Sequence, residues 1–222
     1  MKECRRRGIS VEIPPELQSM LNAEHGPTKQ KAARLVVDLA ASAGASEFTQ
    51  CAHAHVSGVS VITGGHGLRR FLSDLSGDPE GTVSIPTTLN SAGCDREQIE
   101  EMGIDHENFL EYQFEIIHAY SELGIDATLS CTPYDRGVEM ESGIGSWAES
   151  NAVCYSNSYT SLMTNRESGL SALATALTGW APLWGLHIES NRIPNILVTV
   201  EASMENLADW SVLGDWIGMQ IK

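Results

Sequence analysis

Four short polar stretches contain the residues best suited to bind a ligand. They are "HVSGVSV", "TTLNSAGCD", "SCTPY" and "WAESNAV", and each follows an apolar run or opens a helix-like one. Their side chains are mostly small hydrogen-bond donors and acceptors rather than long charged groups. Backbone N–H groups and hydroxyls of this kind suit a small anion that carries several oxygen atoms. The four stretches therefore predict a binding site for such a ligand.

The cysteines are the other candidates for chemistry. There are five, Cys4, Cys51, Cys94, Cys131 and Cys154, with wide spacing and no CxxC pair. This spacing is typical neither of a disulfide framework nor of a local zinc module, so we expect a reducing compartment, the cytoplasm. A metal would need ligands from distant segments. From spacing alone Cys131 has two interpretations, a metal ligand at a strand end or a buried free thiol.

Helices and strands must position these residues, and the apolar spacing predicts where they lie. Helical spacing covers 28–43, 106–123, 147–158, 168–179 and 205–221, and shorter helices are expected at 64–75 and 96–102. Strand-like runs lie at 48–56, 82–90, 124–131 and 195–202. His53 and His55 lie in the first of these runs. We expect them to face opposite sides of the strand and therefore not to form a metal pair.

Strands that alternate with helices predict an α/β fold with a largely parallel sheet and flanking helices. Ligands of such sheets bind at the carboxyl ends of the strands. The four polar stretches would all lie at that edge. We expect an irregular segment over residues 1–16 and one catalytic unit over 17–222, which ends inside an apolar helix and is therefore expected to be incomplete.

Charge and length exclude two classes of partner. The net charge of the 222 residues is −15, which would repel nucleic acid and anionic membrane surfaces. No apolar run approaches the roughly 18–20 residues that cross a bilayer. The basic start "MKECRRRG" lacks the apolar segment of a secretory signal. We therefore expect neither nucleic acid nor membrane as a partner.

A series of short motifs resembles the catalytic domain of the aconitase X family. The blocks "AHVSGVS", "PTTLNSAG", "EEMGI", "CTPY", "WAESNAV", "TNRE" and "GLH" follow one another in the family's order and cover nearly the whole chain after about Leu17. The resemblance implies an aconitase-like fold and a hydro-lyase that removes water from a small anionic hydroxy acid. The expected substrate is 5-phosphomevalonate, in a mevalonate pathway of isoprenoid biosynthesis, and the alternative is cis-3-hydroxy-L-proline.

The resemblance also implies a cofactor and site residues. Cys131 would bind an iron–sulfur cluster, expected to be of the 4Fe–4S type, in which an open iron helps hydroxide to leave. Glu149 and Ser150 would be catalytic, with Glu149 orienting the leaving water or carrying a proton. The expected substrate-binding residues are Gly58, Val59, Ser60, Asn90, Ser91 and Arg166. Ser91 departs from the proline common in the family, and Arg166 is equally compatible with a surface salt bridge.

The family pattern has parts that this sequence does not show. The other cluster cysteines lie beyond the matched region, so the ligand set of this chain is expected to be incomplete. A small swivel-domain subunit that supplies a catalytic serine is the expected partner. We therefore expect little or no dehydratase activity from the chain alone. A hypothesis of another class is a truncated, non-catalytic binding or assembly subunit.

Overall fold

The computed structural model describes residues 11–95, 97–104 and 108–221. The chain divides into two compact units, Met1–Asn191 and Arg192–Lys222, and each is described by itself. The expected irregular segment at residues 1–16 lies largely outside the described residues. In its described part, residues 11–14 precede α1 (Pro15–Leu21), and the Val11 side chain is buried.

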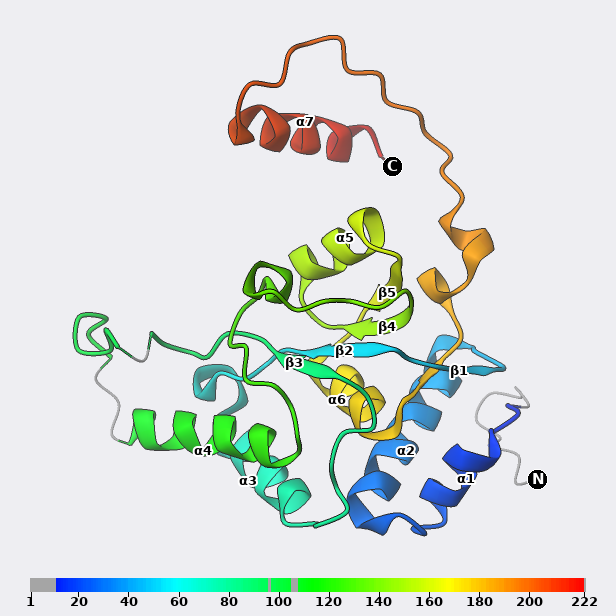
Figure 1. Ribbon diagram of the computed structural model, residues 1–222, viewed down its shortest axis with the longest axis vertical. Helices are drawn as coiled ribbons and strands as arrows, with labels where there is room; N and C mark the ends of the chain where they lie inside the picture. The colour runs from blue at the N-terminus through cyan, green and yellow to red at the C-terminus, as the bar shows by residue number, and fades with distance from the viewer. Residues whose placement is uncertain (1–10, 96, 105–107, 222) are drawn as a thin grey trace. The chain divides into compact units, whose positions relative to one another are not determined.

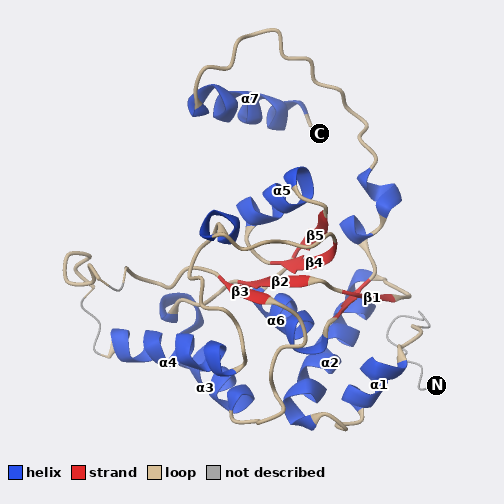
Figure 2. Cartoon of the chain, viewed as in Figure 1, coloured by secondary structure: helices blue, strands red, loops and turns tan. Residues whose placement is uncertain are grey.

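A four-stranded parallel sheet forms the centre of the first unit (Figures 1 and 2), with the strand order β3-β2-β4-β5. These strands are β2 (His53–Val56), β3 (Thr87–Leu89), β4 (Gly143–Trp147) and β5 (Leu162–Arg166). A separate antiparallel pair joins β1 (Phe48–Gln50) to β6 (Trp180–Pro182). The predicted α/β fold with a parallel sheet is confirmed.

Helices cover both faces of the parallel sheet, and each face has its own apolar core. On one face Figure 1 shows α6 (Gly169–Thr178) against the strands, and the larger core joins it to α2 (Gly26–Ala43), α3 (Val61–Ser76) and α4 (Phe109–Glu122). The other face carries α5 (Ser150–Tyr159) and a smaller core around Trp147. Side chains alternate between these cores along β2, as a strand with two covered faces requires.

The helix signals in the sequence correspond closely to the observed ends. The predicted helix 28–43 is α2, whose small apolar face is buried and which ends at Gly44 with φ 73°. Predicted helices 106–123 and 168–179 are α4 and α6. Ser168 caps α6 by a reciprocal hydrogen-bond pair with Ser171, so the polar residues at its start fix the helix origin.

Two predicted elements are wrong in the first unit, and a third has a wrong start. Residues 124–131 form no strand beyond one bridge at Asp126, because Leu129 adopts φ 47° and interrupts the extended run. The predicted helix 147–158 begins only at Ser150, since Trp147 is the last residue of β4. The predicted helix 96–102 is not formed by its described residues: 97–102 form bends and turns, and Asp95 Oδ1 accepts hydrogen bonds from the N–H groups of Glu97 and Gln98. Strands β4, β5 and β6 and the 3-10 turns η1 (Pro133–Arg136), η2 (Gly185–His187) and η3 (Glu189–Arg192) were not expected.

The expected orientation of His53 and His55 is also wrong. Residues two apart in a strand share one face, and both imidazole rings contact Trp147, at ring-centroid distances of 5.5 and 5.3 Å. They lie on the face covered by α5. The prediction failed because it assigned residues i and i+2 of a strand to opposite faces of the sheet.

The second unit consists of an extended segment and one helix, α7 (Leu207–Gln220). The predicted helix 205–221 is confirmed as α7, but 195–202 forms no strand, because it pairs with no other strand among the described residues. The unit exposes large apolar side chains, among them Leu197 at 92% and Leu207 at 85%. In the described part of the chain no helix is both long and apolar enough to span a membrane.

Candidate functional site

The carboxyl ends of the four parallel strands bring most of the predicted site residues to one edge of the sheet. Gly58–Ser60 follow β2, Asn90 and Ser91 follow β3, and Glu149 and Ser150 follow β4. Arg166 is the last residue of β5 and is exposed. This clustering follows from the parallel arrangement, because all carboxyl ends of such strands point the same way.

Asn90 and Glu149 form the hydrogen bond that joins two of these strand ends. Asn90 is buried, and its Nδ2 donates to Glu149 Oε2 at 2.7 Å. The other carboxylate oxygen, Oε1, accepts from the backbone N–H of Ser150 at 3.0 Å and from its hydroxyl at 3.4 Å. Three donors therefore fix the orientation of the Glu149 carboxylate at the start of α5.

Cys131 lies in a loop outside the sheet, and its side chain contacts the same cluster. Its Sγ lies 3.4 Å from the hydroxyl oxygen of Ser91, and its carbonyl oxygen accepts from Asn151 Nδ2 of α5 at 3.2 Å. The preceding residues run beside β3, where the Thr128 hydroxyl donates to the carbonyl of Leu89 at 2.8 Å. These contacts place a half-buried thiol next to the Asn90–Glu149 pair, although no strand ends at Cys131.

A stacked pair of tyrosines holds the turn after Cys131. The rings of Tyr134, in η1, and Tyr155, in α5, lie 3.7 Å apart at an angle of 14°. Burial raises the pKa of Tyr134 from its ordinary value. The stack and the Asn151 contact both attach the cysteine segment to α5, so the position of Cys131 follows that of the helix behind Glu149.

Gln113 is a site residue that the sequence reasoning missed. It lies in α4 with 1% of its surface exposed, and its Oε1 accepts hydrogen bonds from the N–H groups of Val61 and Gly93, each at 3.1 Å. Its Nε2 donates to the carbonyl oxygen of Val59 at 2.9 Å. Gln113 thus joins the loops after β2 and β3. A polar residue within the apolar face of a predicted helix was the available signal.

The loop after β2 contributes backbone more than side chains. Val59 is buried in the core, so only its backbone could contact a ligand, and Gly58 is exposed with φ 81°. The Ser60 hydroxyl caps α3 by accepting from the N–H of Ile62 at 3.1 Å. Because α3 and α5 both begin at this edge, their positive dipole ends favour an anion there.

A hollow of about 670 Å³ opens beside Ser91. Residues that line it include Ser91, Cys94, Asp95, Phe114, Leu129 and Arg136. Ser91 is the member of the cluster of Asn90, Ser91, Cys131, Glu149 and Ser150 that lines it. Arg166 takes no part in the hydrogen bonds that join that cluster. The hollow thus provides room for a small ligand beside Ser91.

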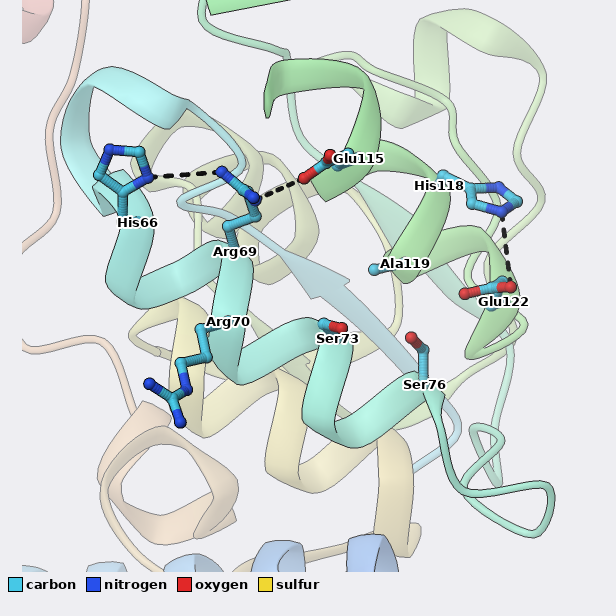
Figure 3. A pocket seen from close by; sticks show the side chains of 9 residues that line it. All are labelled: His66, Arg69, Arg70, Ser73, Ser76, Glu115, His118, Ala119 and Glu122. Carbon is cyan, nitrogen blue, oxygen red and sulfur yellow. Dashed lines mark hydrogen bonds and ion pairs between the residues drawn. The ribbon is translucent and has the colours of Figure 1, made fainter. Parts of the chain in front are cut away.

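A second groove, of about 600 Å³, lies between α3 and α4 and is shown in Figure 3. Arg69 pairs there with Glu115, and His118 Nε2 lies 3.4 Å from Glu122 Oε1. None of the site residues predicted from the sequence lines it. Because Arg69 pairs with Glu115 and His118 lies against Glu122, we interpret it as a solvated groove between two amphipathic helices.

The comparisons with known proteins agree with this fold. The family model described as "Aconitase X first domain" matches residues 10–190, and the chain therefore belongs to the aconitase X family. The chain is 39% identical over 204 residues to the phosphomevalonate dehydratase large subunit of Methanosarcina mazei, covering 91% of this chain and 50% of that protein. It is 35% identical to a cis-3-hydroxy-L-proline dehydratase of Hypocrea jecorina, covering 86% of this chain and 32% of that protein.

A solved structure supports the same assignment. The crystal structure of Thermococcus kodakaraensis aconitase X in its holo-form matches with a TM-score of 0.79 and 35% identity, over 95% of this chain and 52% of that one. The chain thus spans about half the length of the large subunits that it matches. The aconitase-like α/β fold is therefore established for this chain.

Proposed function

We propose that this chain forms the first half of a hydro-lyase of the aconitase X type, which removes water from 5-phosphomevalonate. The observation that carries the proposal is the cluster of Cys131, Ser91, Asn90, Glu149 and Ser150 at the carboxyl edge of the sheet. The resemblance of the motifs gives these residues their roles, and the hydrogen bonds make those roles spatially compatible.

The residues of this chain would bind and orient the substrate. The N-termini of α3 and α5, together with the loops of Gly58–Ser60 and Asn90–Ser91, offer N–H groups and hydroxyls to a carboxylate or phosphate. Glu149 would carry a proton or orient the leaving water from its fixed position, with Ser150 beside it. Arg166, the exposed last residue of β5 beside β4, would clamp a larger anion.

Phosphomevalonate is favoured over hydroxyproline by the relatives. Five phosphomevalonate dehydratase large subunits match at 32–39% identity over about half their length, whereas the two hydroxyproline dehydratases match at 34–35% over about a third of theirs. The identities overlap, so cis-3-hydroxy-L-proline remains the alternative substrate. We infer a cytoplasmic enzyme of isoprenoid biosynthesis.

The donor set of the described residues is not sufficient for a complete iron–sulfur site. Among them, no group of three or more His, Cys, Asp or Glu side chains is placed to hold a metal ion. Cys131 is half-buried, and a second thiol, Cys94, lines the neighbouring hollow. We propose that Cys131 supplies one ligand of a 4Fe–4S cluster whose other ligands come from the second half of the large subunit.

The relatives named large subunits imply a small-subunit partner. We propose that this partner is a swivel domain that brings a catalytic serine to the site. A direct test is anaerobic reconstitution with iron and sulfide, followed by assays with both hydroxy acids. We expect the chain alone to bind no complete cluster and to show little or no turnover. The chain with the second half and the small subunit should dehydrate phosphomevalonate, and robust turnover by the chain alone would contradict the proposal.

A second candidate function is a non-catalytic binding or assembly subunit. The incomplete donor set and the exposed apolar side chains of the second unit favour it. The same reconstituted complex discriminates between the two functions. Saturable binding of phosphomevalonate without elimination of water would support the non-catalytic alternative.

A further inference from the structure

We propose that His55 is a positioning residue of the candidate site, which holds β3 and β4 in register beneath the Asn90–Glu149 bond. The inference deepens the proposed function and rests on it for the activity readout. The sequence predicted only that His53 and His55 form no metal pair, and His55 is not among the site residues that the resemblance implies. Its place in the sheet suggests otherwise.

The relevant geometry begins with the strand order. Asn90 follows β3 and Glu149 follows β4, but these two strands are not neighbours, because β2 lies between them. The Asn90–Glu149 hydrogen bond therefore crosses over β2. A small sliding of either outer strand along β2 would lengthen this 2.7 Å bond. The backbone of β2 pairs with both neighbours, and a side chain of β2 that contacts both would add to this registration.

His55 is the side chain that contacts both neighbours. It pairs in register with Thr88 of β3 and with Trp147 of β4. Its Nδ1 lies 2.8 Å from the hydroxyl oxygen of Thr88, and its ring centroid lies 5.3 Å from that of Trp147. Asn90 lies two residues beyond Thr88, and Glu149 two beyond Trp147. His55 therefore spans the same two strands one pair of residues below the Asn90–Glu149 bond.

The edge strand is held on both sides. On the side away from β2, Asp126 forms a bridge with Thr88, and the Thr128 hydroxyl bonds to the backbone of Leu89. The His55–Thr88 contact adds a side-chain connection on the side of β2. β3 is three residues long and pairs with β2 alone within the sheet. The His55–Thr88 contact lies at the middle residue of this short strand and is buried, with 0% and 3% of the two side chains exposed. A buried hydrogen bond in such a short strand resists sliding more than an exposed one, since breaking it leaves both groups without water.

His53 provides the matched comparison. It lies on the same face of β2, is 5% exposed and packs against the same tryptophan at 5.5 Å. Its Nδ1 has no hydrogen-bond partner, and it is one pair of residues further from the carboxyl edge. A change at His53 therefore alters the core around Trp147 without touching the connection to β3.

The test uses variants that keep a hydrogen-bonding group at the position of either Nδ1 or Nε2 of His55. The amide of Asn superposes approximately on Nδ1 of histidine, so His55→Asn keeps a group that can bond Thr88. His55→Gln places its amide near Nε2 and loses that bond, as Thr88→Val does from the other side. In the reconstituted enzyme we expect kcat to fall at least about tenfold in His55→Gln and Thr88→Val. It should stay within about threefold in His55→Asn and His53→Asn.

A second readout needs no activity and distinguishes failure of this inference from failure of the proposed function. Hydrogen exchange of the Asn90 side-chain amide, followed by NMR in the isolated chain, reports the Asn90–Glu149 bond. We expect exchange at least about tenfold faster in His55→Gln and Thr88→Val than in His55→Asn, His53→Asn or the unmodified chain. Equal exchange rates in all five proteins would overturn the inference. If the unmodified enzyme turns over neither hydroxy acid, the proposed function fails while the exchange result still decides the role of His55.

Discussion

The side-chain amide of Asn90 donates a 2.7 Å hydrogen bond to Oε2 of Glu149, although the two residues are 59 positions apart in the sequence. The bond joins the ends of two strands that do not pair with each other. Asn90 Oδ1 accepts from the N–H of Ser91 at 2.6 Å, so the amide orientation is fixed and Nδ2 must face the carboxylate. One interaction thus links the predicted substrate-binding loop after β3 to the predicted catalytic loop after β4.

Substitutions can test that Asn90 is the hydrogen-bond donor and Glu149 the acceptor in this pair. Asn90→Asp leaves the bond to Ser91 possible but places a second carboxylate against Glu149, so we expect a loss of about 1–3 kcal/mol in the free energy of unfolding. Adding Glu149→Gln to the same chain restores a donor and an acceptor and should recover most of the loss. Urea unfolding of both single variants and the double variant measures the coupling. Additive effects would show that the two side chains do not interact.

Gly93 packs closely against Ser60 in the loop after β2, so a larger side chain at position 93 should clash there. A Cβ at Gly93 would collide with the Ser60 hydroxyl and would lie 3.0 Å from Gln113 Oε1. We expect Gly93→Ala to destabilise the fold by about 1–3 kcal/mol and to weaken ligand binding, because it separates the loops after β2 and β3. Gly67→Ala in α3 is the control, since a Cβ there meets no atom within 4 Å. Equal stability of the two variants, measured by urea unfolding, would contradict the observed packing.

The buried histidines predict a pH dependence of stability. Burial lowers the pKa of His53 and of His55 from 6.5 to about 4. Between these values the unfolded chain binds more protons than the folded one, so stability is full above pH 6.5 and falls as the pH drops toward 4. The loss is about 3 kcal/mol for each histidine. Urea unfolding at several pH values should show this fall, and His53→Phe, which keeps a ring against Trp147, should reduce its slope by about half. An unchanged slope would contradict the prediction.

The cysteines should differ in reactivity. Burial, and next the negative Glu167, raise the pKa of Cys51 to about 12, so its thiolate is scarce at neutral pH. Cys154 is exposed and Cys131 half-buried. We expect iodoacetamide at pH 8 to modify Cys154 and Cys131 well before Cys51 in the native chain, as measured by peptide mass mapping. Unfolding in urea should remove the difference.

Cluster formation should change the same labelling pattern. When the complete large subunit is reconstituted with iron and sulfide, we expect protection of Cys131 and continued labelling of Cys154. Removal of iron by a chelator should restore the labelling of Cys131. Labelling of Cys131 that is the same with and without a spectroscopically verified cluster would exclude it as a ligand.

Much of the fold was predictable because its signals are local. The apolar face of α2 and Gly44 after it mark one helix, and the Ser168–Ser171 cap marks the start of α6. The errors occurred where tertiary contacts override local preference. Residues 124–131 have strand-like composition, but Leu129 turns the chain and the hydroxyl of Thr128 bonds to the end of β3 instead. Trp147 belongs to β4, and its side chain packs against α5. The neighbouring residues in the sequence do not indicate this contact.

The sequence by itself determined the α/β class, the family and the residue types at the carboxyl edge of the sheet, because short motifs and helix-ending residues are read from neighbouring positions. Only the tertiary structure decided which of those residues meet. It joined Asn90 to Glu149 across β2, brought Cys131 to Ser91, placed Gln113 between two loops and put both histidines of β2 against Trp147. Contacts of this kind depend on strand order and register, which are fixed by long-range packing and not by any one segment.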